Sequence, residues 1–188
     1  MNEEICKKAI ESLSDYRKLH SFNVAKCARS LAELYNADVK KAYLTGLVHD
    51  VTKEFSEDQH IALFNKYNFI LDDVQKATPK LWHSISGALF VKYVLKEDDD
   101  DVYNAIRFHT TGRSDMSLLE KIIFVSDFVS EERNYGGVDK IREVLKNDGL
   151  DACALEGLAF SINDLSLRKK YIHNDTLCAY NQILKKFN

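Results

Sequence analysis

Apolar residues recur every three to four positions along almost the whole chain. This period indicates helices, and no segment shows the two-residue alternation that is typical of strands. We therefore predict an all-α fold, a compact helical bundle of about ten helices. The helical stretches cover residues 3–13, 15–35, 39–51, 56–67, 71–77, 81–95, 102–110, 118–132, 138–146, 150–171 and 174–187.

Several helix starts carry capping residues. Asp38 precedes an apolar stretch and is a good N-cap, because its side chain can accept from free backbone amides. Ser56 followed by Gln59 forms a capping-box pattern. Further N-caps are expected at Asp15, at Ser117, and at Asn174 or Asp175.

Composition narrows the class of protein. The chain has 188 residues, so we expect a single domain over residues 1–188. Its 45% hydrophobic and 29% charged residues suit a globular protein. The charged N-terminus is unlike a signal peptide, and no apolar run is long enough to cross a bilayer. The four cysteines form no CxxC pair and are interpreted as reduced, mostly buried thiols, so a cytoplasmic location is expected.

A small set of polar residues interrupts the apolar helix faces. His49 and Asp50 end one apolar helix, His20 lies on the inner face of the helix before it, and Asp127 interrupts the apolar run IIFVSDFV. A buried carboxylate needs a partner, and no cation lies close to Asp127 within its own helix. A divalent cation shared with several imidazoles would satisfy it. By contrast, His60 lies in a polar helix and is predicted to be a surface residue.

The residue types restrict the metal. Imidazole and carboxylate without thiolate suit iron, manganese, cobalt, nickel or zinc. They favour a hydrolytic centre over a purely structural metal site. Arg17 lies one helical turn before His20, Lys53 lies three residues after Asp50, and Arg133 follows the helix that carries Asp127. Such cations would suit an anionic, phosphate-bearing ligand.

At this point the chain resembles a known family. The order His20, His49–Asp50, Asp127 is similar to the HD-domain metal phosphohydrolases. The segments YRKLHSFNVAKCA, GLVHDVTKEF, WHSISGA, AIRFHTTG and YIHNDTLCAYN are similar to the YqeK group, bacterial symmetrical diadenosine tetraphosphate hydrolases. The resemblance runs from about Tyr16 to Asn181.

The resemblance implies roles for matching positions. His20, His49, Asp50 and Asp127 would bind one or two divalent ions, iron being the most common in this group. Asp50, Lys53, His83 and His109 would act at the reaction centre. The substrate contacts would be Arg17, Lys53, His83, His109, Arg133, Tyr171, Ile172, His173, Asn174 and Asp175. Where the group often has an acidic residue, this chain has Ser130, so the roles of Glu131 and Glu132 stay open.

The implied activity is symmetrical hydrolysis of diadenosine tetraphosphate to two ADP, with metal-bound water attacking an inner phosphate. Two alternatives remain open: another HD-type nucleotidase or phosphodiesterase, and a non-catalytic nucleotide sensor. The net charge of −3 argues against a nucleic-acid partner, and no membrane partner is expected. Apolar helix surfaces suggest a homodimer.

Overall fold

The computed structural model describes residues 1–188 and contains helices but no strands. The all-α prediction of about ten helices is confirmed. One element, η1, is a short 3₁₀ turn, and α5 is a single turn. The elements are α1 (Glu3–Ala9), α2 (Asp15–Leu34), α3 (Val39–Val48), α4 (Glu57–Lys66), α5 (Asp73–Lys76), η1 (Pro79–Leu81), α6 (Trp82–Tyr93), α7 (Asp100–Arg107), α8 (Leu118–Val129), α9 (Val138–Asp148), α10 (Leu150–Leu167) and α11 (Asn174–Leu184).

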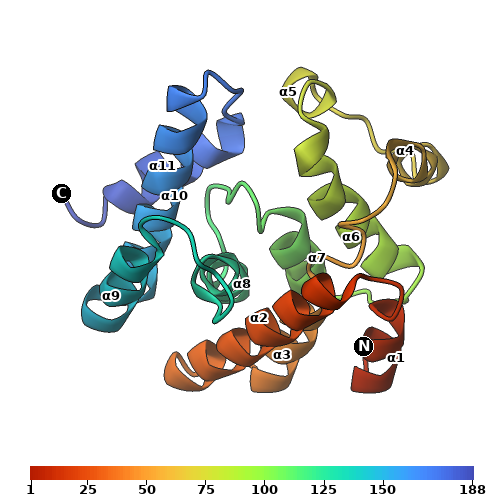
Figure 1. Cartoon of the computed structure of the whole chain (residues 1–188), viewed down its shortest axis with the longest axis horizontal. Helices are drawn as coiled ribbons and strands as arrows, with labels where there is room; N and C mark the ends of the chain where they lie inside the picture. Colours follow the sequence, from red (N-terminus) through yellow and green to blue (C-terminus); the bar gives the residue numbers. More distant parts are fainter.

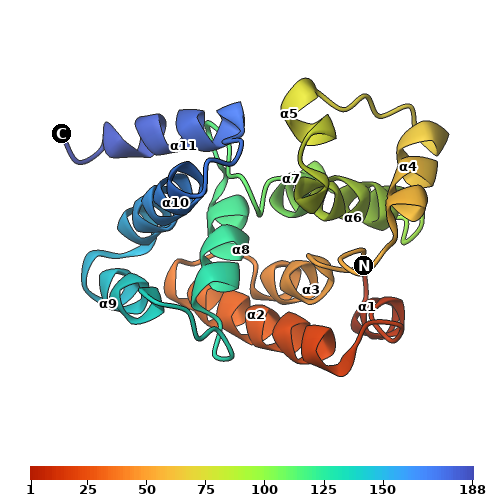
Figure 2. The same ribbon diagram turned by 45° about the horizontal axis from the view of Figure 1, so that its top comes forward.

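Helix α8 lies in the middle of the molecule (Figures 1 and 2). Helices α2 and α3 lie side by side along one side of it, α6 and α7 on another, and α9, α10 and α11 on the third. The apolar faces of these helices form one large core. Its most deeply buried side chains include Leu47, Ile106, Ile122, Phe124 and Leu158. Because the core holds α2, α3, α7 and α8 together, polar groups at their inner faces are brought to one place.

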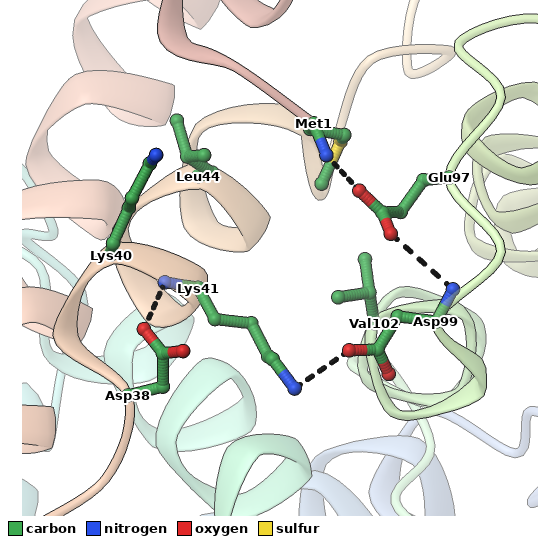
Figure 3. A pocket seen from close by; sticks show the side chains of 8 residues that line it. All are labelled: Met1, Asp38, Lys40, Lys41, Leu44, Glu97, Asp99 and Val102. Carbon is green, nitrogen blue, oxygen red and sulfur yellow. Dashed lines mark hydrogen bonds and ion pairs between the residues drawn. The ribbon is translucent and has the colours of Figure 1, made fainter.

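Charged groups join the amino terminus to the segment before α7, and that segment to α3 (Figure 3). The amino terminus of Met1 pairs with Glu97, and Lys41 pairs with Asp99 at 2.6 Å. Asp99 also caps α7 by accepting from the Asp101 backbone amide. The acidic run therefore starts a helix, because carboxylates are favoured near a helix N-terminus.

Most capping predictions are confirmed. Asp38 caps α3, and Ser56 and Ser117 form complete capping boxes on α4 and α8. Two caps are displaced by one residue. Ser14, not Asp15, caps α2, and His173, not Asn174 or Asp175, caps α11.

Helix α10 is shorter than the periodicity predicted, ending at Leu167 instead of Tyr171. Lys169 takes a left-handed conformation with φ 51°, and the Lys170 amide returns to the Leu165 carbonyl, which closes the helix end. Cys178 is exposed, so the expectation of mostly buried thiols is wrong for this residue. No helix is long and apolar enough to span a membrane. The assignment of residues 1–188 to one domain stays a prediction.

At Gly46, the backbone of α3 packs closely against that of α2. A Cβ atom built there would lie 2.9 Å from the Ala25 Cα, a backbone atom that cannot yield without moving α2. We expect Gly46→Ala to lower the free energy of unfolding by about 1–3 kcal/mol, the usual cost of overpacking. Urea unfolding checks this against Gly136→Ala, where no atom lies within 4 Å of the new methyl group. Equal stability of the two variants would contradict the tight contact.

His173 joins α11 to the α5 turn. Its Nε2 lies 2.8 Å from Asp72 Oδ2, and a hydrogen bond to Asp175 is the main cause that raises the pKa of His173, with Asp72 adding to it against burial. Because the pKa of His173 is raised in the folded state, the stability that its ion pairs contribute is complete below about pH 6.5, the ordinary pKa of histidine. That stability is lost as pH rises through the folded-state pKa.

We therefore expect the stability difference between the natural chain and His173→Gln to shrink as pH rises above 6.5. Urea midpoints measured for both proteins across this range check the sign. A difference that stays constant or grows with pH would show that the ion pairs of His173 do not contribute.

Candidate active site

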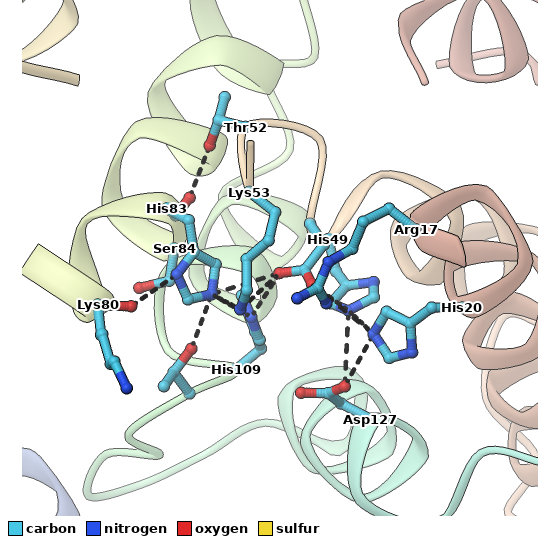
Figure 4. Close-up of polar contacts among 12 residues, drawn as sticks. Arg17, His20, His49, Thr52, Lys53, Lys80, His83, Ser84, His109 and Asp127 are labelled. Atoms are coloured by element: carbon cyan, nitrogen blue, oxygen red, sulfur yellow. Dashed lines mark hydrogen bonds and ion pairs between the residues drawn. The ribbon is translucent and has the colours of Figure 1, made fainter. Parts of the chain in front are cut away.

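Four imidazole rings and two carboxylates meet where five helices converge (Figure 4). His20 comes from α2, His83 from the start of α6, and Asp127 from α8. His49 and Asp50 follow the last turn of α3, and His109 follows α7. The four predicted metal ligands and the two additional histidines therefore lie together, although 107 positions separate His20 from Asp127 along the chain.

Two groups of donor atoms meet at Asp50. On one side, His20 Nε2 lies 3.1 Å from Asp127 Oδ1 and 3.7 Å from Asp50 Oδ2, and His49 Nε2 lies 3.2 Å from His20 Nε2. On the other side, His83 Nε2 and His109 Nε2 lie 3.3 Å and 3.4 Å from Asp50 Oδ1. The two oxygens of one carboxylate thus face different pairs of imidazoles.

The Nδ1 atom of each of the four rings already has a hydrogen-bond partner. His49, His83 and His109 each donate Nδ1–H to a backbone carbonyl three residues earlier, at 2.7–2.8 Å. His20 donates Nδ1–H to Glu132. In the neutral rings the Nε2 lone pairs must therefore face one another, at 3.2 Å for His20 and His49 and 3.1 Å for His83 and His109. Two lone pairs cannot bond to each other, so each pair of rings needs either a proton or a metal ion between its Nε2 atoms.

The carboxylate of Asp50 also indicates that a cation fits this site. Its side chain is 2% exposed, and Oδ1 has no hydrogen-bond partner. Burial alone would raise its pKa, but His49, Lys53 and His83 hold the pKa well below the ordinary value. A buried, ionised oxygen without a hydrogen bond is costly unless a cation binds it. The residues therefore fit a divalent metal, and they include two sets of donors that share Asp50.

Three predicted cations surround the centre. Arg17 Nη1 lies 3.4 Å from Asp50 Oδ2, and Lys53 Nζ lies 3.4 Å from Asp50 Oδ1 and 2.9 Å from His83 Nε2. Arg133 reaches back from the loop after α8, pairs with Asp127, and donates Nε–H to the Asp127 carbonyl at 2.8 Å. Burial would raise the pKa of Asp127, but His20, His49 and Arg133 hold it well below its usual range.

The predicted segment from Tyr171 to Asp175 does not touch this cluster. His173 bonds to Asp72 and lies near Gln75, and Tyr171 is 63% exposed beside η1. No hydrogen bond or ion pair joins Ile172, Asn174 or Asp175 to the histidines and aspartates of the centre. The five residues lie before and at the start of α11, next to α5, to which His173 bonds.

Glu132 is a site residue that the sequence did not assign. It accepts from His20 Nδ1, Asn23 Nδ2 and Ser130 Oγ, and although burial raises its pKa, these hydrogen bonds lower the pKa to about 2. An acidic residue soon after the helix that bears Asp127 was the available signal. Ser130 hydrogen-bonds Glu132 and thus supports His20 indirectly.

His60 corrects a prediction. It is 6% exposed, not a surface residue, and its Nδ1 lies 2.8 Å from Ser86 Oγ. Together with Trp82 it lines a pocket of about 470 Å³ that also contains Arg17, Lys53 and His83. The polar residues around His60 in sequence face solvent, whereas the ring itself packs under α6.

Comparisons with known proteins agree with this geometry. The HD domain family model matches residues 17–132, a range that ends at Glu132. The chain belongs to the HD-domain family. This HD protein is 38% identical to the symmetrical bis(5'-nucleosyl)-tetraphosphatase of Halalkalibacterium halodurans, over 92% of this chain and 91% of that one. It is 32% identical to the enzyme of the same name from Bacillus subtilis, over 98% of each chain.

A solved structure shares the whole fold of this HD protein. The crystal structure of a predicted HD superfamily hydrolase involved in NAD metabolism, from Clostridium acetobutylicum, has a TM-score of 0.92 and 34% identity. The match covers 98% of this chain and 97% of that one. The predicted family is confirmed, and all helices that carry the centre belong to the shared fold.

Glu132 offers a test of the metal centre that does not depend on activity. We expect Glu132→Ala to weaken metal binding by about 10–100-fold, because His20 loses the acceptor that fixes its tautomer. Metal content after dialysis against graded chelator measures this. Glu131→Ala is the matched control, since Glu131 is exposed. Unchanged metal retention in Glu132→Ala would show that Glu132 does not support the centre.

Proposed function

We propose that this protein is a metal-dependent symmetrical bis(5'-nucleosyl)-tetraphosphatase that hydrolyses diadenosine tetraphosphate to two ADP. The observation that carries the proposal is the convergence of four imidazole Nε2 atoms on the buried carboxylate of Asp50, with three cations beside it. The names of the relatives with nearly full-length similarity support the same substrate class. A polyphosphate is the ligand that needs both a metal and several cations close together.

The metal would be held by His20, His49, Asp50 and Asp127, with His83 and His109 available on the other oxygen of Asp50. When bound, it supplies the charge that activates a water molecule and offsets the charge of the phosphoryl group. We propose iron as the resident metal, in keeping with the family resemblance. The donor set is equally compatible with manganese, cobalt, nickel or zinc.

The cations would orient the phosphates. Lys53 lies between Asp50 and His83, so its ammonium can contact a phosphoryl oxygen close to the metal. Arg17 and Arg133 lie on the two sides of the carboxylates and can bind neighbouring phosphates through their forked donors. Fixed positive charge next to the developing negative charge stabilises the transition state without rearrangement.

The bonds change as follows. The oxygen of water joins one of the two central phosphorus atoms, and the bond from this phosphorus to the central bridging oxygen breaks. One ADP keeps the bridging oxygen, and the other ADP carries the oxygen from water. His83 and His109 have Nδ1–H committed to backbone carbonyls, so they would face the reaction through Nε2. Tyr171 and the start of α11 would contact the nucleoside rather than the reacting phosphorus.

We further propose that the protein acts in the cytoplasm on small molecules, without a nucleic-acid or membrane partner, and forms a homodimer. The net charge of −3 and the exposed apolar residues Ile70 and Leu167 support these proposals.

The product assay separates the candidate functions. Metal-loaded protein is incubated with diadenosine tetraphosphate, and the nucleotides are resolved by anion exchange. We expect ADP alone. AMP with ATP would reject symmetrical attack, and no turnover with any metal would favour another HD substrate or the nucleotide-sensor alternative.

Lys53 tests the catalytic arrangement. We expect Lys53→Met to lower kcat by about 10²–10³-fold, the usual loss when one charge-stabilising donor is removed. Its metal content should stay near that of the natural chain, because Lys53 is not a metal donor. Lys66→Met is the control, since Lys66 is an exposed lysine at the end of α4. Full turnover by Lys53→Met would remove Lys53 from the mechanism.

A further inference from the structure

A pocket beside the candidate centre contains a buried histidine, His60, that the proposed reaction does not use. The pocket measures about 470 Å³, within the range of small-molecule sites. Its lining combines aromatic rings with cations: Phe55, His60, Trp82, Arg17, Lys53 and Lys80. His83 lines it as well, so the pocket opens onto the centre. We call it the His60 pocket.

His60 begins a chain of hydrogen bonds that ends at the backbone of His83. Its Nδ1 lies 2.8 Å from Ser86 Oγ, which in turn lies 2.8 Å from Thr52 Oγ1. The Thr52 hydroxyl donates to the His83 carbonyl at 2.9 Å, as Figure 4 shows. All four residues are buried, so each bond in the chain is made within the protein and not with bulk water.

The last acceptor determines the direction of every bond in this chain. A carbonyl oxygen can only accept, so the single hydroxyl proton of Thr52 is used on His83. The contact between Thr52 and Ser86 then requires the single hydroxyl proton of Ser86. Ser86 has no proton left for His60, so Nδ1 of His60 is the donor. The neutral ring therefore carries a lone pair on Nε2.

This Nε2 is an acceptor that the protein leaves free. It makes no hydrogen bond within the chain, yet it is not sealed from solvent. Three apolar rings surround the imidazole, with centroids 5.9–6.3 Å away: Phe55, Phe64 and Trp82. Burial lowers the pKa of His60, so near pH 7 the ring is neutral and Nε2 keeps its lone pair.

The other histidines show the opposite arrangement. Each of the five directs Nε2 toward a carboxylate, four of them toward Asp50 and His173 toward Asp72. Only in His60 does the outward nitrogen face a pocket instead of a protein partner. A buried acceptor without a partner is costly, so the His60 pocket favours a ligand that donates a hydrogen bond.

The cations of the pocket suit a second, different part of that ligand. Arg17 and Lys53 lie 3.4 Å from Asp50, at the end of the pocket next to the centre. Lys80 is exposed and has no ion-pair partner, and Glu57 is the one carboxylate of the lining. Phosphates suit the cations but are repelled by a neutral acceptor. A ligand that satisfies both has a phosphate chain followed by a group with O–H or N–H donors.

We propose that the His60 pocket binds the nucleoside of one half of the substrate, the half that extends away from α11. This inference rests on the proposed function. His60 Nε2 accepts a hydrogen bond from that nucleoside, from a ribose hydroxyl or the adenine amine, and the partly exposed ring of Phe55 packs against its base. The start of α11 holds one nucleoside in the proposed function, whereas the substrate has two, so a separate place is needed for the other.

Two variants separate the free acceptor of His60 from its bond to Ser86. Asparagine can place an N–H donor where histidine has Nδ1, so His60→Asn keeps the bond to Ser86 and removes the acceptor. Glutamine can place an oxygen where histidine has Nε2, so His60→Gln keeps the acceptor and removes the bond. Phe55→Leu tests the aromatic contact. Its matched control is Phe187→Leu, since Phe187 is 50% exposed near the end of the chain.

Titration calorimetry on metal-loaded protein measures the binding of two ligands. The first is diadenosine tetraphosphate with a methylene group as the central bridge, which needs a place for both nucleosides. The second is ADP, whose single nucleoside takes the place at the start of α11. Circular dichroism and urea unfolding check that each variant folds.

We expect His60→Asn and Phe55→Leu to bind the methylene analogue about tenfold more weakly, the loss of roughly one contact, and ADP within about twofold. His60→Gln and Phe187→Leu should bind both ligands within about threefold of the natural chain. With an analogue built from purine riboside, which has no amine, a persisting effect of His60→Asn assigns the bond to the ribose. Loss of that effect assigns it to the amine.

Three results would overturn the proposal. The first is normal analogue binding by His60→Asn. The second is equal loss of analogue and ADP, which would show that His60 acts on the centre as a whole. The third is loss in His60→Gln but not in His60→Asn, which would assign His60 a structural role through Ser86.

The failure of this inference differs from failure of the proposed function. If the natural chain yields ADP from diadenosine tetraphosphate but His60→Asn binds the analogue normally, only the role of the His60 pocket is wrong. If His60→Asn loses analogue binding while the natural chain gives no ADP, the pocket stands and the symmetrical reaction is wrong.

Discussion

The structure depends on one buried carboxylate. Asp50 lies almost without solvent contact between two pairs of imidazole nitrogens, and both of its oxygens face nitrogen donors, not water. Removing a carboxylate from water is expensive unless charge and hydrogen bonds replace the lost hydration. Here Arg17 and Lys53 replace part of it, and the imidazole lone pairs around it create a place where a divalent cation would replace the rest.

The helices around Asp50 orient the rings through their own backbones. Each of His49, His83 and His109 lies three residues after the carbonyl that accepts its Nδ1–H, at a helix end or in a turn. These carbonyls fix the tautomer and direct Nε2 inward. His20 lies inside a long helix, where backbone carbonyls are already used, and it takes Glu132 from a distant loop instead. The centre is therefore preorganised by helix ends together with one long-range carboxylate.

The same geometry explains which site residues could be predicted from the chain. The HD pair, His20 and Asp127 interrupt apolar helix faces, and burial of polar groups is a strong signal of function. Glu132 and His60 give no such signal, because both occur among polar residues in sequence. Their roles come from contacts with Asn23, His20 and Ser86, which lie 26 or more positions away. Tyr171 shows the reverse case, since the motif that suggested a substrate contact lies outside the metal cluster.

Local physical chemistry in the sequence alone determined the helices, because apolar periodicity and side-chain caps act within a few residues. The resemblance of its motifs indicated the family, and imidazole and carboxylate without thiolate restricted the metal and so the chemical type of the centre. Tertiary packing alone decided that Asp50 serves two sets of imidazoles, that Glu132 holds His20, and that His60 bonds to Ser86 at the wall of a pocket. These relations depend on how α2, α4, α6 and α8 pack together, and no local pattern encodes the distance between side chains on separate helices.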